Sequence, residues 1–495
     1  MIDFSDFKSC ELPLRHFVAL TAIPRGSGNT KPIADYLVDF AKSRGLEHYR
    51  DEADNVIIKK PATEGMRGRP GIIFQGHTDI VAEKLADADI DMTKEGPRIL
   101  RDGDFLRAEG TTLGGDDGVA MAYALAVLDS DDIEHPDFEA VFTSDEEIGL
   151  LGADALDASV LKGRTMINID SDAEGVFTVG CAGGVRCDIS LPVNYEFCEQ
   201  PCAYEIQLKG LRGGHSGIEI DKGHANAVKV VAELLKEIPN VRIVSITGGN
   251  ADNAIPRECT AEITGNEDLP DHLWPALRKR KEMLALASAV ANGDKPVEGI
   301  VNQSLREAEP DMDFSLYRLC RPIAVMDENS TKALLSLLSE LPSGVVAMNE
   351  ELGMVQTSLN LGILRTHLDR VDLSFSVRSA VGEEKRALCQ RLRAIAEEHG
   401  AGYGERGEYP AWEYKKESHL RDVMCKVYSE MYGNAPEVVT IHAGLECGIF
   451  AGKMEGLDCV SIGPNNYDIH TPDERLSISS TARVWEFLKT ILKNI

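Results

Sequence analysis

The spacing of apolar residues near the start of the chain predicts an amphipathic helix over residues 30–45. Ile33, Leu37 and Phe40 recur at helical spacing and so lie on one face. Thr30 stands at the N-cap position, Pro32 falls in the first turn, and a glycine follows the last periodic position.

Short apolar runs separate this helix from the next one. Residues 55–60, 71–77, 138–147 and 164–172 contain runs that read as strands, and the last two run into acidic residues. Residues 117–128 are mostly small and apolar, which predicts a helix that packs closely against a sheet. This alternation predicts an α/β domain with a mainly parallel sheet, in which functional groups collect where the strands end.

A second domain is predicted within the first. Composition changes near residues 181–184, after which a strand and turn at 203–217 precede a helix at 224–238. A comparable strand and helix recur at 371–380 and 382–400, and strand and helix alternation resumes near Pro410. We therefore expect one domain in two parts, 1–185 and 409–495, and a second domain, of α+β type, inserted over 186–408.

Charge and composition narrow the choice of partners. The 495 residues carry a formal net charge of −29, which disfavours nucleic acid and anionic membrane surfaces as partners. The sequence has no apolar run of membrane-spanning length and no signal-peptide layout at its start. Its 11 cysteines are scattered, and the Cys198 and Cys202 spacing has no second pair to complete a zinc site. We expect reduced thiols and cytoplasmic residence.

The stretch FQGHTDIVAEK raises the first question of chemistry. His77 and Asp79 stand two positions apart at the end of a strand, so their side chains point the same way. The pair fits a metal ligand with its orienting carboxylate, or two polar residues where the chain meets solvent.

Carboxylates also follow other predicted strands. They are Asp116 and Asp117, Glu146 and Glu147, and Asp170 and Asp172. Each pair alone is explained by helix capping, because acidic residues favour helix N-termini. Together, massed carboxylates repel one another unless a cation lies among them.

A late histidine completes a candidate set. His470 follows a Gly-Pro turn, and with His77 it supplies two imidazoles to the carboxylates Asp116, Glu147 and Asp170. Mixed nitrogen and oxygen ligation suits two divalent ions, zinc first, with cobalt or manganese as substitutes. Paired metals serve hydrolysis.

At this point the sequence resembles the M20 metallopeptidases, and within them the aminoacyl-histidine dipeptidases. The matching segments run in order from Gly76 to the C-terminal region: GHTDIV, GTTLGGDDG, TSDEEIGLLGA, NIDSD, CAGG, GGHSGIEI, NADNAIPRE, IHAGLECGIF and HTPDERL. GDDG stands where the family more often has Ala-Asp-Asn-Gly, and HTD where it has His-Met-Asp. These departures remove no ligand and leave the preferred substrate open.

The resemblance implies a two-domain zinc-peptidase architecture, in which residues 1–185 and 409–495 form the catalytic domain and residues 186–408 an inserted lid or dimerisation domain. It also implies a role for each candidate. His77 with Asp170 would hold one ion, Glu147 with His470 the other, and Asp116 would bridge them. The family pattern also makes Asp79 the residue that orients His77, and Glu146 the general base. It implies a cis peptide bond between Asp116 and Asp117, and the register of NID favours Asp170 over Asp172 as the ligand.

Family analogy extends to substrate binding in the inserted domain. His215 would steady the carbonyl oxygen, often across a dimer interface, although a turn histidine is the simpler interpretation of GGHSG alone. Asn253 and Arg378 are candidates for binding the substrate's C-terminal carboxylate, although an arginine at a strand end is usually solvated. His442 and Glu446 would lie near the site in roles that the sequence does not assign.

The sequence thus predicts a cytoplasmic, homodimeric metal-dependent dipeptidase that hydrolyses Xaa-His and other dipeptides. Another M20-type amidohydrolase, acting on N-acyl or N-carbamoyl amino acids, is the alternative within enzymes. A non-catalytic metal-binding protein is the alternative outside them, and the presence of every expected ligand and of the expected base argues against it.

Overall fold

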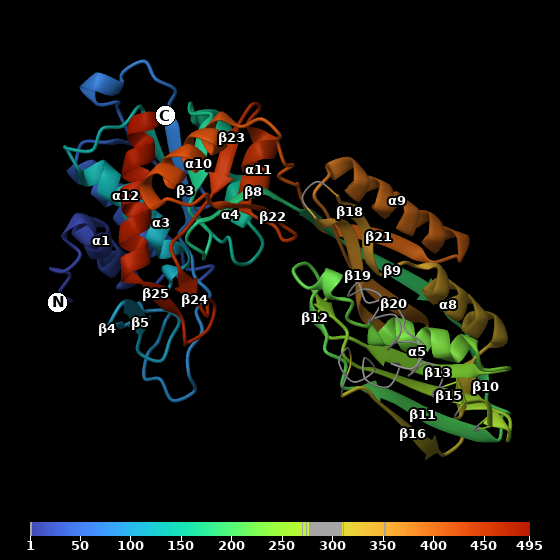
Figure 1. Ribbon diagram of the computed structural model, residues 1–495. Helices are drawn as coiled ribbons and strands as arrows, with labels where there is room; N and C mark the ends of the chain where they lie inside the picture. The colour runs from blue at the N-terminus through green and yellow to red at the C-terminus, as the bar shows by residue number, and fades with distance from the viewer. Residues whose placement is uncertain (1, 270, 274, 277–308, 310, 351–352) are drawn as a thin grey trace. The chain divides into compact units, whose positions relative to one another are not determined.

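The chain folds into two compact units (Figure 1). The computed structural model describes residues 2–269, 271–273, 275–276, 309, 311–350 and 353–495. Unit 1 comprises Met1–Cys181, Trp412–Ile441 and Leu445–Ile495, and unit 2 comprises Ala182–Ala411 and His442–Gly444. The boundaries expected at 185 and 408 fall a few residues from these transitions, and residues 277–308 of the expected inserted domain lie outside the described residues.

Unit 1 contains a mixed sheet in the strand order β1-β2-β6-β3-β7-β23-β8-β22. Its strands are β1 (Glu47–Arg50), β2 (Val56–Lys60), β3 (Ile72–His77), β6 (Phe138–Thr143), β7 (Thr165–Asn168), β8 (Val176–Cys181), β22 (Glu437–Ile441) and β23 (Asp458–Ser461). The central strands β6, β3, β7 and β23 are parallel, as the sequence predicts, whereas β1, β2 and β6 pair antiparallel, as do β23 and β8. The parallel strands bring several loops to one edge of the sheet.

Helices and a small second sheet complete unit 1. The helices are α1 (Glu11–Thr21), α2 (Lys31–Ser43), α3 (Gly115–Asp129), α4 (Leu151–Ala155), α10 (His419–Tyr432), α11 (Glu446–Lys453) and α12 (Ile478–Asn494), with short 3₁₀ turns at Lys8–Cys10, Glu64–Met66 and Ala158–Val160. The second sheet consists of β24 (Asn466–Tyr467), β25 (Arg475–Ser477), β5 (Phe105–Ala108) and β4 (Ile99–Asp102), in that order.

Helices α2 and α3 illustrate how the sequence sets the packing. Ile33, Leu37 and Phe40 are buried on one face of α2, and Thr30 occupies the N-cap position, but its side chain makes no capping hydrogen bond. Helix α3 is buried almost throughout, because its alanines allow it to lie close to α1 and β3.

Unit 2 is an α+β unit built on an antiparallel sheet in the order β16-β11-β15-β13-β19-β20-β9-β21, with β18 also paired to β19. Its strands are β9 (Gly183–Pro192), β11 (Cys202–Lys209), β13 (Arg242–Gly248), β15 (Cys259–Gly265), β16 (Asp313–Leu319), β18 (Gly344–Asn349), β19 (Met354–Thr366), β20 (Arg370–Ser379) and β21 (Gly402–Tyr409); the pairs β10 (Tyr195–Phe197) with β17 (Ala324–Met326) and β12 (Gly214–His215) with β14 (Ala254–Ile255) are separate. Three helices pack on this sheet: α5 (Ala227–Lys236), α8 (Glu328–Glu340) and α9 (Gly382–Glu398). Helix α8 contacts both α5 and α9, and a 3₁₀ turn covers Ile220–Lys222.

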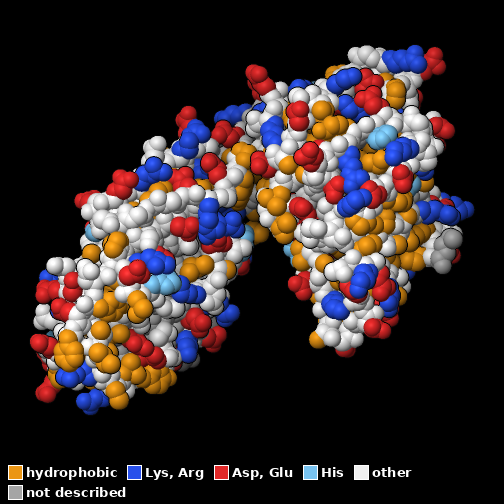
Figure 2. All heavy atoms as spheres, turned by 180° about the vertical axis from the view of Figure 1, so that it is seen from behind, with side chains coloured by type: hydrophobic (Ala, Val, Ile, Leu, Met, Phe, Trp, Pro, Cys, Tyr) orange, Lys and Arg blue, Asp and Glu red, His pale blue; other side chains and the backbone are white. Residues whose placement is uncertain are grey.

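Each unit has its own hydrophobic core. The 11 cysteines all fall within the described residues and are free thiols. Across the described ranges, no helix combines the length and apolar character needed to cross a membrane. Figure 2 shows acidic side chains interspersed with Lys and Arg over the visible face, so the net negative charge is not gathered there in one patch.

Candidate metal centre

The expected ligands lie at one edge of the unit 1 sheet. His77 is the last residue of β3, and Asp170 follows β7, the parallel neighbour of β3. Glu146 and Glu147 follow β6, which is parallel to β3 on its other side. Because parallel strands end at the same edge, side chains far apart in the sequence meet there.

Asp116 lies between the two histidines. Its Oδ1 atom is 2.9 Å from His77 Nε2, and its Oδ2 atom is 3.1 Å from His470 Nε2. The peptide bond between Asp116 and Asp117 is cis, as the resemblance implies. One carboxylate thus presents a separate oxygen to each imidazole, which is the arrangement of a bridging ligand.

The remaining distances fit two adjacent coordination sites. His77 Nε2 lies 3.7 Å from Asp170 Oδ1, and His470 Nε2 lies 3.0 Å from Glu147 Oε1. Donors bound tetrahedrally at about 2.0–2.1 Å from an ion are about 3.3 Å apart, and the observed separations bracket that value. Among the described residues, the sets His77–Asp116–Asp170 and Asp116–Glu147–His470 each bring one ligand atom per residue within 4.8 Å of the others, and so does a third set, His77–Glu146–Glu147.

The charge of the cluster also calls for cations. The buried Oε1 atom of Glu147 has His470 Nε2, at 3.0 Å, as its neighbour and makes no other hydrogen bond. Burial raises the pKa of Asp170 well above its usual value, and burial together with Glu446 and Glu147 raises the pKa of Glu146 to about 8 against the opposing influence of His77. Negative charge is therefore unfavourable at Asp170 and Glu146, and bound divalent ions would remove the penalty.

The protons of the two histidines point to the same conclusion. Hydrogen bonds to Asp116 and Glu147 raise the pKa of His470 to about 10, and the His77 pKa is raised by Asp116 and Asp79 against the effect of burial. Metal ions replace protons on such ligands, so the cluster has the nitrogen and oxygen donors that zinc accepts.

Asp79 is fully buried and has more contacts than the sequence indicates. His77 Nδ1 lies 3.1 Å from the backbone carbonyl of Asp79 and 3.5 Å from its carboxylate. The carboxylate accepts hydrogen bonds from Ser27 Oγ at 2.7 Å and from the amides of Glu146 at 2.9 Å and Glu147 at 3.3 Å. Asp79 therefore positions the acidic loop after β6 as well as the His77 ring.

Two residues that the sequence analysis missed hold the loop before Asp116. The buried Glu474 carboxylate accepts hydrogen bonds from the amides of Leu113, Gly114 and Gly115 at 2.7–2.9 Å. Arg25, also buried, donates to the carbonyls of Thr78 at 2.9 Å and Gly114 at 2.6 Å. The only sequence signal was the place of Glu474 in HTPDERL, since contacts with backbone groups leave no pattern along the chain.

A second buried network lies beneath the cluster. Glu446 is fully buried and accepts hydrogen bonds from Gln75 Nε2 at 2.5 Å and Thr143 Oγ1 at 2.7 Å, and Asn168 donates to Gln75 at 2.7 Å. Each of these partners stands near the end of a strand that leads to a candidate ligand: Gln75 in β3, Thr143 in β6 and Asn168 in β7. Burial raises the pKa of Glu446 to about 7.

Three of the expected substrate-binding residues meet in unit 2. A Cβ atom at Gly217 would lie 2.4 Å from the His442 carbonyl oxygen, 3.1 Å from His215 Cε1 and 3.3 Å from Arg378 Nε. Gly217, the last glycine of GGHSG, is therefore required by close packing. His442 Nε2 lies 2.7 Å from Ser358 Oγ.

Arg378 and Asn253 differ in their surroundings. Arg378 is 8% exposed, so the expectation that a strand-end arginine is solvated is wrong here, since the side chain donates to Tyr409 Oη at 2.9 Å within the unit. Its Nε atom is buried and has no hydrogen-bond partner. Asn253 is exposed, and its carbonyl accepts a hydrogen bond from the Ser216 amide.

Asp172, the alternative to Asp170 as a metal ligand, is exposed and belongs to none of the candidate ligand sets.

Comparisons with known proteins agree with the motifs. The chain is 34% identical to the cytosol non-specific dipeptidase of Escherichia coli over 97% of its own length and 96% of that protein. The crystal structure of aminoacylhistidine dipeptidase from Vibrio alginolyticus matches with a TM-score of 0.89 at 33% identity, covering 99% of each chain. Aminopeptidase PepT from Bacillus cereus shares the fold at 17% identity, with a TM-score of 0.54 and 98% of each chain covered.

The family model described as Peptidase family M20/M25/M40 matches residues 73–494, which span both units. The resemblance inferred from the motifs is confirmed, as are the α/β fold class and the assignment to the peptidases. This chain belongs to peptidase family M20/M25/M40.

Proposed function

We propose that this protein is a di-metal dipeptidase that cleaves Xaa-His and other dipeptides. The names of the Escherichia coli and Vibrio alginolyticus relatives support dipeptides as the substrate class. The observation that carries the proposal is the Asp116 carboxylate, whose two oxygens each face a different imidazole. We also propose cytoplasmic residence, the compartment named for the Escherichia coli relative, and a homodimeric state.

The distances between side chains support the proposed division of ligands between two ions. His77 and Asp170 would hold one ion, Glu147 and His470 the other, and Asp116 both. Zinc suits these donors, and cobalt or manganese can replace it. When bound, such a pair lowers the pKa of a water molecule and polarises the scissile carbonyl.

Glu146 is the proposed general base. It adjoins the ligand Glu147, and its amide is fixed by Asp79, yet it belongs to neither of the two assigned ligand sets. Its carboxylate takes a proton from the attacking water and returns that proton to the leaving amine, which restores the carboxylate.

Unit 2 supplies the proposed substrate contacts. His215 Nδ1 accepts hydrogen bonds from the amides of Gly217 and Ile218, both at 3.2 Å, so in the neutral ring the proton is on Nε2. That Nε2–H group can donate to the substrate carbonyl oxygen. Arg378, with its unpartnered Nε, suits the C-terminal carboxylate, and Asn253 and His442 are proposed to bind the same part of the substrate.

The adjacent glutamates provide a matched test of the mechanism. We expect Glu146→Gln to retain two metal ions per chain and to lose at least about 10³-fold in kcat, because the proton acceptor is removed. Glu147→Gln should instead lose metal, because a ligand is removed. Metal analysis and dipeptide turnover on both variants decide the assignment, and loss of both metals from Glu146→Gln would make Glu146 a ligand.

A substrate panel tests the substrate class. Dipeptides, including one with a C-terminal histidine, are compared with N-acyl and N-carbamoyl amino acids in the presence of zinc or manganese. We expect turnover of dipeptides that a chelator abolishes. Preferential turnover of the acylated amino acids would reassign the activity within the family, and no turnover of any compound would favour a non-catalytic protein.

A further inference from the structure

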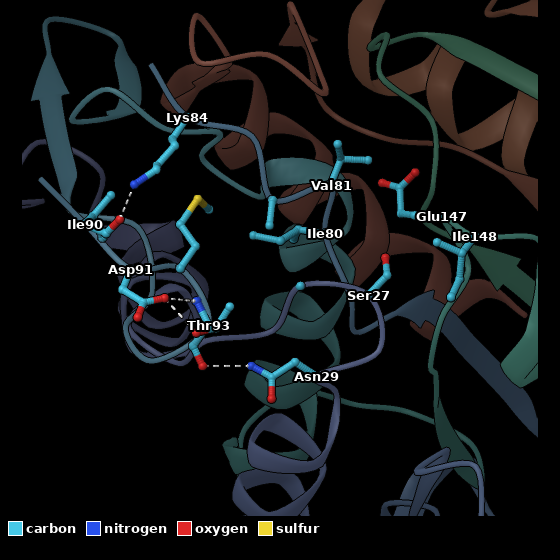
Figure 3. A pocket seen from close by; sticks show the side chains of 13 residues that line it. Ser27, Asn29, Ile80, Val81, Lys84, Ile90, Asp91, Thr93, Glu147 and Ile148 are labelled. Atoms are coloured by element: carbon cyan, nitrogen blue, oxygen red, sulfur yellow. Dashed lines mark hydrogen bonds between the residues drawn. The ribbon is translucent and has the colours of Figure 1, made fainter. Parts of the chain in front are cut away.

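A cavity of about 640 Å³ lies beside the metal centre, within unit 1 (Figure 3). The metal ligand Glu147 forms part of its lining, so the cavity adjoins the place where the scissile carbonyl would bind. Figure 3 shows Val81, Glu147 and Ile148 on one side of it, and Lys84, Ile90 and Asp91 on the other. Its volume is in the range of pockets that bind small molecules.

Apart from Glu147, the polar side chains that line the cavity already have hydrogen-bond partners. Ser27 Oγ donates to Asp79 at 2.7 Å, Asn29 Nδ2 to a backbone carbonyl of the lining at 3.2 Å, and Lys84 Nζ to another at 2.7 Å. Asp91 accepts hydrogen bonds from its neighbours on the loop. A ligand group that enters the cavity is therefore offered few free donors or acceptors.

The remaining surface of the cavity is apolar. Ile80, Val81, Ile90 and Met92 line it, and Ile148, the residue after Glu147, stands at 56% exposure. Because the Ile148 side chain is half-exposed, a substrate group that covers it removes apolar surface from water, which favours binding. The lining thus favours an apolar group attached close to the scissile bond.

We propose that this cavity binds the side chain of the first residue of the dipeptide and favours apolar side chains there. The inference rests on the proposed dipeptidase function and names the substrate position that this part of unit 1 selects. The lining comes entirely from residues 26–148 of unit 1, whereas the proposed binders of the C-terminal carboxylate belong to unit 2.

Covalent geometry favours the first side chain over the second. The Cα atom of the first residue is bonded directly to the scissile carbonyl carbon, whereas that of the second residue is separated from it by the leaving nitrogen. The side chain of the first residue is therefore closer to the scissile carbonyl, and so closer to a cavity beside Glu147, than that of the second residue. Each methylene group removed from water contributes about fourfold to binding, so Leu-Gly should be preferred over Gly-Gly.

Three peptides test the proposal by varying one side chain at a time. We compare kcat/KM for Leu-Gly, Gly-Leu and Gly-Gly in the wild-type enzyme and in Val81→Phe, which narrows the cavity. Ile148→Ser removes one apolar wall at an exposed position and serves if Val81→Phe fails to fold. Leu100→Ser is the matched control, because Leu100 is 49% exposed in unit 1 and lies outside the lining.

The ratio of kcat/KM for Leu-Gly to kcat/KM for Gly-Gly should fall about tenfold in Val81→Phe and about threefold in Ile148→Ser. The Gly-Leu to Gly-Gly ratio should stay within about twofold of wild type, as should both ratios in Leu100→Ser. Metal content is measured on each variant, so that a loss of Glu147 ligation is recognised separately.

Two results would overturn the inference while leaving dipeptidase activity in place. A fall in the Gly-Leu ratio alone would assign the cavity to the second side chain, and unchanged ratios in both variants would mean that no substrate side chain enters it. A metal-loaded wild-type enzyme that hydrolyses neither these three peptides nor a dipeptide with a C-terminal histidine would refute the proposed function, and this inference with it.

Discussion

Asp79 and Glu474 each turn a buried carboxylate toward backbone amides of a loop that carries a proposed ligand or the proposed base. Asp79 accepts from the amides of Glu146 and Glu147, and Glu474 from the amides just before Asp116. Hydrogen bonds of this kind, with a charged acceptor, are stronger than those between neutral groups. The position of the metal ligands therefore depends on residues that need not touch metal or substrate.

His442 gives a prediction at the same scale. Burial, with the nearby Arg378 cation and His215, lowers the pKa of His442 to about 4. In the unfolded chain its pKa is about 6.5, so between these values protons bind mainly to the unfolded state. We expect the free energy of unfolding to fall by up to about 3 kcal/mol as the pH decreases from 6.5 to 4, and this contribution to level off below pH 4.

Denaturant titrations at several pH values measure this contribution. His442→Asn should lose that part of the pH dependence, which the wild-type protein should retain. An identical pH dependence in His442→Asn and wild type would show that His442 does not titrate as described.

Among the elements, β3 and α3 approach each other where both lead into the metal centre. A Cβ atom at Gly76 would lie 2.2 Å from Asp117 Oδ2 and 2.3 Å from the Ala120 Cβ atom. Asp117 Oδ2 also accepts a hydrogen bond from the His77 amide at 3.2 Å. The close contact between strand and helix therefore helps to place His77.

Gly76→Ala tests this contact. The added methyl group should force the strand and the helix apart, lower the free energy of unfolding by about 1–3 kcal/mol and weaken metal binding. Gly65→Ala, where a Cβ atom meets nothing within 4 Å, should change stability by less than about 0.5 kcal/mol. Denaturant unfolding and metal titration measure both effects, and equal stability of the two variants would contradict the packing argument.

The elements that carry ligands could be predicted because their cause is local. Hydrophobic runs that end in polar or acidic residues predict β3, β6 and β7 and the side chains at their ends. The resemblance of the motifs adds the expected roles of His77, Asp116 and His470 as metal ligands. The supporting contacts of Arg25 and Glu474 could not be predicted, because they join a side chain to backbone groups far away in sequence. Their partners are set by the folded chain alone.

On the scale of the whole molecule, all seven proposed metal-centre residues belong to unit 1, although they are spread over nearly four hundred positions. They are His77, Asp79, Asp116, Glu146, Glu147, Asp170 and His470. Unit 2 has a separate core. Bound metal should therefore stabilise the two units unequally.

Metal removal tests this expectation. Ions present at about 1,000 times their dissociation constant stabilise the folded unit by about 4 kcal/mol, and a chelator removes that contribution. Hydrogen exchange should accelerate in peptides covering β3, β7 and residues 144–150, with no change in β19 and β20 of unit 2. Equal acceleration in both units, or none in either, would contradict a metal centre confined to unit 1.

Glu474, which accepts hydrogen bonds from the amides of residues 113–115, and His470 both follow the other proposed metal-centre residues in the sequence. This order has a consequence for synthesis on the ribosome. Asp170 leaves the ribosome three hundred residues ahead of His470, an interval of roughly 15–60 s at about 5–20 residues per second. Throughout that interval the nascent polypeptide contains His77, Asp116, Glu147 and Asp170 but lacks His470, the last of the proposed ligands. If His470 is a metal ligand as proposed, hydrolytic competence should be acquired only after His470 has emerged.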